Sequence, residues 1–78
     1  MAASMLTPYG DLVDARWNSG NVLVRVNGGT ETTAFALATE SGLALLPFPD
    51  GRWCLVYEDG NGVIQRMYSA DRGTTWEE

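Results

Sequence analysis

Residues 53–68 read Trp-Cys-Leu-Val-Tyr-Glu-Asp-Gly-Asn-Gly-Val-Ile-Gln-Arg-Met-Tyr and are the part of the chain most indicative of its architecture. Two runs rich in aromatic and β-branched residues flank the turn-forming residues 59–62, a pattern typical of a β-hairpin. A two- or four-residue loop at this position predicts that Tyr57 pairs with Ile64. That register places apolar side chains on both faces of the hairpin.

One of these two faces is where we expect another protein to bind. A sheet that is apolar on both sides needs a covering layer on each side, and the rest of this short chain is enough for only one layer. We therefore expect Val56, Val63 and Met67 to form an interface with other protein subunits. The alternative is that the N-terminal strands curl into a small barrel that closes the sheet on itself.

Outside the hairpin, clusters of Gly, Asn, Asp and Pro separate short apolar runs at regular intervals, as in antiparallel all-β chains. The strands are expected near residues 11–17, 21–27, 31–38, 43–46, 52–58 and 62–69, with a stub at 75–77. The alanine-rich run 32–39 fits a strand but also tolerates a helical turn, and Pro47 and Pro49 mark an edge or an exit from the sheet. The predicted fold is one small β domain over residues 1–78, a hairpin-built antiparallel sheet, sandwich or partial barrel.

Residues 69–76, Ser-Ala-Asp-Arg-Gly-Thr-Thr-Trp, form a further turn signal. The Asp71 carboxylate can accept hydrogen bonds from backbone N–H groups about two residues further on, and Gly73 supplies a positive φ. The indole of Trp76 is expected to act as an apolar plug beside the turn. The positions that specify this turn are Ser69, Asp71, Gly73, Thr75 and Trp76.

The pattern S-x-D-x-G-x-T-W in residues 69–76 resembles an Asp-box, the turn repeated around the propellers of sialidases and other bacterial-neuraminidase-repeat proteins. Residues 42–78 resemble most of one blade, but the motif occurs once, and a propeller needs several blades. The resemblance implies a turn that lies away from the catalytic face. The arginine triad, tyrosine–glutamate pair and aspartic acid of sialidases match no motif in this chain, so no catalytic residue is carried over. Asp-box modules also occur in phage tail and fibre proteins, which implies a virion tail or baseplate as the assembly.

Composition narrows the possible functions further. The chain has 78 residues, a net charge of −5, one cysteine and no histidine, and all five of its positive charges are arginines. The commonest metal ligand, the commonest general base, the P-loop lysine and Schiff-base chemistry are therefore missing. The acidic balance argues against nucleic acid as a partner. Residues 1–10 lack the pattern of a signal peptide and no apolar run is long enough for a membrane span, so we expect cytoplasmic synthesis, with later incorporation into a virion if the assembly is a phage tail.

The remaining candidate chemical sites are weak. Glu58 and Asp59 are adjacent at the end of a hairpin, so they point in different directions and do not form the carboxylate pair of a glycosidase. Asp50, Asp59 and Asn61 lack the spacing of a calcium-binding loop. Cys54 has no histidine or lysine to lower its pKa, so we expect a small hydrophobic residue. The sequence therefore predicts no enzyme activity, no metal and no cofactor.

The sequence favours a structural or interaction module that works as a small subunit of a larger assembly. The alternative is a carbohydrate-binding module, because exposed aromatic rings can stack on sugar rings. Trp17, beside the turn at 18–20, is the candidate for such a contact, since Trp53 and Trp76 are accounted for by the hairpin and the 69–76 turn.

Overall fold

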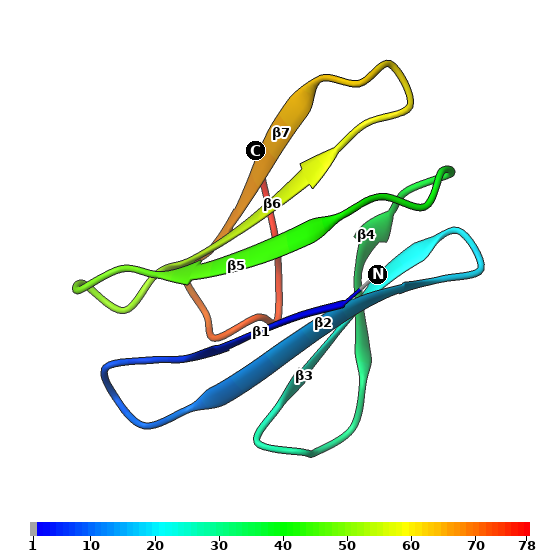
Figure 1. Ribbon diagram of the computed structural model, residues 1–78. Helices are drawn as coiled ribbons and strands as arrows, with labels where there is room; N and C mark the ends of the chain where they lie inside the picture. The colour runs from blue at the N-terminus through cyan, green and yellow to red at the C-terminus, as the bar shows by residue number, and fades with distance from the viewer. Residues whose placement is uncertain (1) are drawn as a thin grey trace.

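The computed structural model describes residues 2–78 and shows seven antiparallel strands in two sheets (Figure 1). The first sheet has the order β1-β2-β3-β4 and the second has the order β5-β6-β7. The strands are β1 (Ala2–Leu6), β2 (Leu12–Asn18), β3 (Asn21–Val26), β4 (Thr32–Ala36), β5 (Leu43–Pro47), β6 (Trp53–Glu58) and β7 (Ile64–Ser69). The described residues contain no helix, and therefore none long and apolar enough to cross a membrane. The two sheets remain separate and do not close into a barrel. The predicted all-β fold class is confirmed.

The two sheets share one hydrophobic core, which lies between them. Because side chains alternate along each strand, every second residue of a strand faces this core. The buried members of the core are Met5, Val13, Ala15, Val22 and Val24 from the first sheet, and Leu45, Trp53 and Leu55 from the second. Each large side chain removed from water in this way contributes about 1.5–3 kcal/mol to the stability of the fold.

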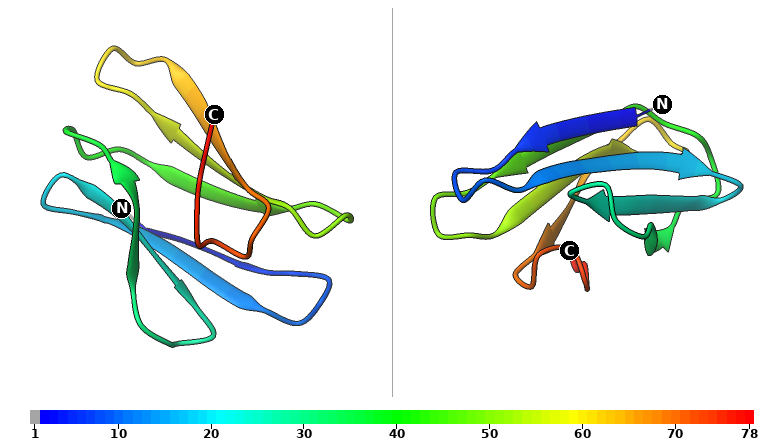
Figure 2. Two further views of the ribbon diagram at one scale, coloured as in Figure 1. Left: turned by 180° about the vertical axis from the view of Figure 1, so that it is seen from behind. Right: turned by 90° about the horizontal axis from the view of Figure 1, so that it is seen from below.

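The sheets meet along one side of the molecule. Figure 1 shows β1 beside β5, and these strands are in contact although they do not pair. The opposite side comes forward in Figure 2 (left), where β4 and the C-terminal segment lie in front. Within residues 2–78, β4 pairs only with β3, but its Phe35 ring packs against the Tyr57 ring of β6, with centroids 5.0 Å apart. The strands of the two sheets therefore lie side by side on the β1–β5 side, whereas side chains bridge the sheets on the β4 side.

The sequence did not predict β1. The run Ala2–Leu6 contains no β-branched or aromatic residue, so its own preference for a strand is weak. Tertiary pairing compensates for this weakness, because Ala3 lies opposite Ala15 and Met5 lies opposite Val13. The strand is therefore held by its neighbour and by the core rather than by local propensity.

The other strand predictions need smaller changes. Residues 32–36 form a strand and not a helical turn, and Pro47 ends the edge strand β5. The stub expected at 75–77 is reduced to one bridge between Glu77 and Tyr68. The N–H of Thr75 is still bonded within the preceding turn, so a longer strand does not form beside β7.

The predicted hairpin forms, but its register is one residue away from the predicted one. Glu58 is the partner of Ile64, which leaves residues 59–63 as the loop. The Asp59 carboxylate accepts the backbone N–H groups of Asn61 and Val63, at 2.9 and 3.0 Å. The predicted register assumes an even number of loop residues. The observed loop has an odd number and is held by Asp59, so the pairing of β7 with β6 is shifted by one residue.

This shift moves every β7 side chain to the other face of the sheet. Met67 lies opposite Leu55 and is buried on the core side, so its assignment to an interface with Val56 was wrong. Ile64 and Tyr68 instead point to the outer face, away from the first sheet, together with Val56.

Candidate functional site

The 69–76 turn is held by its own polar side chains. The Ser69 hydroxyl donates to Asp71 Oδ1 at 2.9 Å and accepts the Gly73 N–H at 2.8 Å. Thr75 donates its N–H to Asp71 Oδ1 at 2.9 Å and its hydroxyl to Asp71 Oδ2 at 2.5 Å. The backbone donor to Asp71 is thus four residues further on, rather than about two as expected. Trp76 donates its Nε1–H to the Gly73 carbonyl at 3.1 Å and packs against the core.

The same turn also joins the two sheets. Gly73 has a φ of +85°, and a Cβ added to it would lie 3.1 Å from Trp53 and 3.6 Å from Val24. The Arg72 guanidinium reaches the Asp11 carboxylate at 2.6 Å, across 61 positions of sequence. Hydrogen bonds from Arg72 and then Asn27 hold the pKa of Asp11 below its usual value. These contacts give the turn a structural role, because the side chains of Ser69, Asp71 and Thr75 already have partners within it.

The pKa of Asp71 predicts a specific acid sensitivity. The Thr75 hydroxyl, then the Thr75 N–H, lower the pKa of this carboxyl from 3.8 to about 2. A pKa that is lower in the folded state stabilises the fold above the unfolded pKa, and this contribution is lost as pH falls through the folded pKa. As the pH falls from about 5 to about 2, the melting temperature of the parent should therefore fall toward that of Asp71→Asn. Thr75→Val, which removes the strongest donor, should show an intermediate pH dependence, and parallel curves for all three proteins would contradict this account.

The other chemically capable side chains are also engaged in the fold. Hydrogen bonds from Val63, Gln65 and Asn61, in that order, keep the pKa of Asp59 low. Cys54 is buried, and burial raises the pKa of its thiol. In the part of the chain that the structure describes, no three Cys, Asp or Glu side chains lie close enough together to hold a metal ion.

Trp17, the candidate sugar contact, lies on the inner side of β2. It is half-buried and packed against the core, and its Nε1–H donates to the Leu37 carbonyl at 2.7 Å. Its polar group and much of its ring are therefore used within the molecule.

Trp17→Phe should lower the free energy of unfolding by about 1 kcal/mol, because the Leu37 carbonyl loses its donor while most of the apolar contact remains. Urea denaturation followed by fluorescence of the other tryptophans would measure this change. A variant as stable as the parent would contradict a role for the hydrogen bond.

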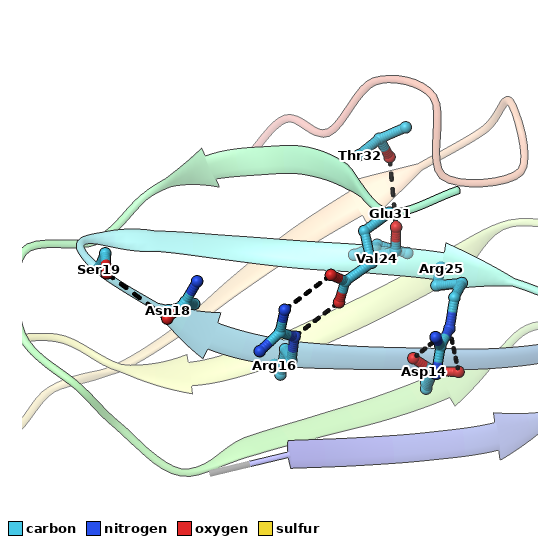
Figure 3. Close-up of polar contacts among 8 residues, drawn as sticks. All are labelled: Asp14, Arg16, Asn18, Ser19, Val24, Arg25, Glu31 and Thr32. Atoms are coloured by element: carbon cyan, nitrogen blue, oxygen red, sulfur yellow. Dashed lines mark hydrogen bonds and ion pairs between the residues drawn. The ribbon is translucent and has the colours of Figure 1, made fainter. Parts of the chain in front are cut away.

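The outer face of the first sheet carries ion pairs, and the ladder partners Leu6 and Leu12, 70% and 51% exposed, lie on the same face. Figure 3 shows Arg16 bonded to Glu31 through two nitrogens, at 2.6 and 2.8 Å, and Arg25 beside Asp14 at 3.4 Å. The Arg25–Asp14 pair joins β3 to β2, and the Arg16–Glu31 pair joins β2 to the turn between β3 and β4. Such exposed ion pairs add little stability, but they leave this face well solvated and its charges partnered.

The outer face of the second sheet is apolar by comparison. We call the outer patch the side chains on this face that lie around Val56: Ala44, Leu46, Val56, Ile64 and Tyr68. Leu46 is 50% exposed and Ile64 is 59% exposed. A shallow pocket of ≈ 260 Å³ lies between Ala44, Val56 and Ile64, with Glu58 at its margin. No other layer of the described chain covers this face, since the first sheet packs on the opposite side.

One end of the outer patch is rigid and aromatic. The ring of Tyr68 stacks on Phe48 with centroids 6.2 Å apart, and the Arg52 guanidinium lies 5.3 Å from the Phe48 centroid. Cys54 is buried beside them, between Leu46 and Tyr68 in the ladder. This end is therefore an ordered surface rather than a set of free side chains.

The sequence identified part of this face. Val56 lies on it, and Val63, in the loop next to Ile64, is 51% exposed. The predicted register, in which Tyr57 pairs with Ile64, places Ile64 and Tyr68 on the face opposite to Val56, although the alternation in β5 could have indicated Leu46. No protein-family model, curated protein or solved structure matches this chain.

Proposed function

We propose that this chain is a non-enzymatic interaction module, a small subunit of a larger protein assembly, which binds its neighbour through the outer patch. The observation that carries the proposal is the pair of exposed side chains, Leu46 and Ile64, on a sheet face without a covering layer. Exposed apolar patches with polar margins are typical of protein interaction sites. Burial of such side chains at an interface is favourable by about 25 cal/mol per Å² of apolar surface.

Binding, and not catalysis, is supported by the use that the fold makes of its acidic side chains. Asp71 and Asp59 each hold the turn in which they occur, and Asp50 bonds the N–H and guanidinium of Arg52. A general acid or base needs a side chain free to reach a substrate. These three carboxylates instead serve as structural acceptors.

A phage tail or baseplate is the assembly that we propose, on the basis of the Asp-box resemblance of residues 69–76. The genomic neighbourhood tests whether the assembly is a phage tail or baseplate. Genes for tail or fibre proteins beside this one would support it, and a neighbourhood without virion genes would contradict it.

The interface itself can be tested with Ile64→Asp. The native mass of the chain should be measured alone and mixed with the products of the neighbouring genes. We expect a stable complex with one of these partners or with itself, and a loss of about tenfold or more in affinity for the variant, which corresponds to about 1.4 kcal/mol.

Leu12→Asp is the matched control, because Leu12 is also a large exposed apolar residue, at 51%, but belongs to the first sheet. It should bind like the parent. A parent chain that stays monomeric and binds none of these proteins would refute the proposal.

The carbohydrate alternative is not favoured by any contact of its candidate residue. The ring of Trp17 is half-buried against the core. Sugar rings stack on accessible aromatic faces, so the half-buried Trp17 does not favour this function.

A further inference from the structure

Two charged side chains stand on the same face as the outer patch. Arg66 is the ladder partner of Val56, and Glu58 is the ladder partner of Ile64. Directly opposed residues of an antiparallel ladder share a face, so both charges project from the outer face. Both residues are exposed.

Neither charge has a partner within residues 2–78. The other four arginines all form ion pairs: Arg16 with Glu31, Arg25 with Asp14, Arg52 with Asp50, and Arg72 with Asp11. Arg66 alone has no carboxylate within ion-pair distance in this part of the chain, and Glu58 has no cation. The fold thus partners its cations on every surface except this one.

The arrangement of the two charges is self-complementary. Glu58 and Arg66 occupy diagonal positions on β6 and β7, and they flank the other diagonal of the same four positions, which joins Val56 and Ile64. A two-fold axis through the patch can bring Arg66 of one copy to Glu58 of the other, and it then brings the second pair together as well. An interface of this kind needs only one patch, because each copy supplies both halves.

We propose that the occupant of the outer patch is a second copy of this chain, in a face-to-face dimer with two reciprocal Arg66–Glu58 ion pairs around an apolar centre. This inference rests on the proposed function, which makes the outer patch the interface. The apolar centre provides the driving force for association. The ion pairs fix the orientation, and they offset the repulsion between two chains that each carry a net charge of −5.

The experiment is a charge exchange read by molecular mass. Sedimentation equilibrium of the parent over a range of concentrations should give a dimer, with twice the 8.5 kDa mass of the chain. Arg66→Glu makes both charges of the patch negative, and Glu58→Arg makes both positive. Each variant alone should dimerise at least about tenfold more weakly than the parent. An equimolar mixture of the two should form a heterodimer about as tightly as the parent dimer.

Two further variants control for the change in net charge and for the substitution of the two side chains themselves. Arg25→Glu changes the net charge as Arg66→Glu does, but it lies on the outer face of the first sheet, and it should leave the dimer intact. The double variant Arg66→Glu with Glu58→Arg restores complementarity within one chain and should dimerise like the parent. The circular dichroism of each variant checks that it is folded.

The outcomes separate this inference from the proposed function. A parent that is monomeric at every concentration, but binds the product of a neighbouring gene in a manner that Ile64→Asp abolishes, overturns the dimer and leaves the proposed function standing. A parent that binds nothing overturns both. A dimer that neither single variant weakens, or that the mixture does not restore, overturns the Arg66–Glu58 pairing.

Discussion

Leu55→Ala is expected to lower the free energy of unfolding by about 2–5 kcal/mol. Leu55 is 0% exposed and lies at the centre of the second sheet, between Leu45 and Met67 in the ladder. Truncation removes buried methyl groups and leaves a cavity that both sheets line. Because a domain of this size buries a smaller share of its surface than a larger domain does and has little stability in reserve, the variant should be substantially unfolded at moderate temperature.

The measurement is equilibrium unfolding in urea, followed by tryptophan fluorescence. Leu12→Ala is the matched control, since it makes the same change at a leucine that is 51% exposed outside the outer patch. Surface changes of this kind alter stability by about 0.5 kcal/mol or less. Equal losses for the two variants would contradict the assignment of Leu55 to the shared core.

Gly73→Ala should be the most damaging change of a single methyl group. Gly73 has a φ of +85°, and an L-residue in this left-handed region pays about 1–2 kcal/mol. The added Cβ would also lie 3.1 Å from the ring of Trp53, which is itself buried. Overpacking a core in this way costs about 1–3 kcal/mol more.

The backbone and packing parts can be separated with Gly20→Ala. Gly20 has nearly the same φ, +86°, but a Cβ there would have nothing within 4 Å. This control should therefore show the backbone cost without the contact. The difference between the two unfolding free energies measures the steric cost of the contact between the added methyl group and Trp53. A Gly73 variant no less stable than the Gly20 variant would refute that contact.

Most of the strands could be predicted from turn residues. Asn, Asp, Gly and Pro have local reasons to leave a strand, so β2 to β7 could be located from the sequence, although the predicted ranges 31–38 and 62–69 are longer than β4 and β7. Residues 2–6 have no such local signal, because alanine, serine, methionine and leucine fit several structures. The strand β1 exists through its pairing with β2 and its contact with β5, which are tertiary effects.

The faces of β7 could not be predicted because they depend on one loop. Asp59 accepts two backbone N–H groups within residues 59–63, and this capture selects an odd loop over the even one that the Gly and Asn residues also allow. One residue of difference sends Met67 into the core and Ile64 to solvent. One of the three candidate interface residues, Met67, was therefore misplaced by a local hydrogen-bond choice, while Val56, on the other strand, was not affected.

The partial burial of Trp17 could not be predicted from the sequence either, because it depends on a distant part of the chain. Its position beside a turn predicts exposure, but β4 and the following residues fold back so that the Leu37 carbonyl meets its indole. The partner is 20 residues away in sequence. Contacts over such distances leave no periodic pattern in the sequence from which they could be read.

The seam between β1 and β5 also constrains when this protein can acquire its structure during synthesis. The first four strands emerge from the ribosome as a complete sheet, yet the inner side chains Val13, Val22 and Val24 find their cover only in residues made later. Arg72 and Gly73, near the end of the chain, then tie the last turn to Asp11 and Trp53. Since its stabilising contacts span nearly the whole chain, the protein should fold slowly for its size and as a single cooperative unit. The nascent chain is therefore expected to remain sensitive to protease until the segment around Arg72 and Gly73 has been made.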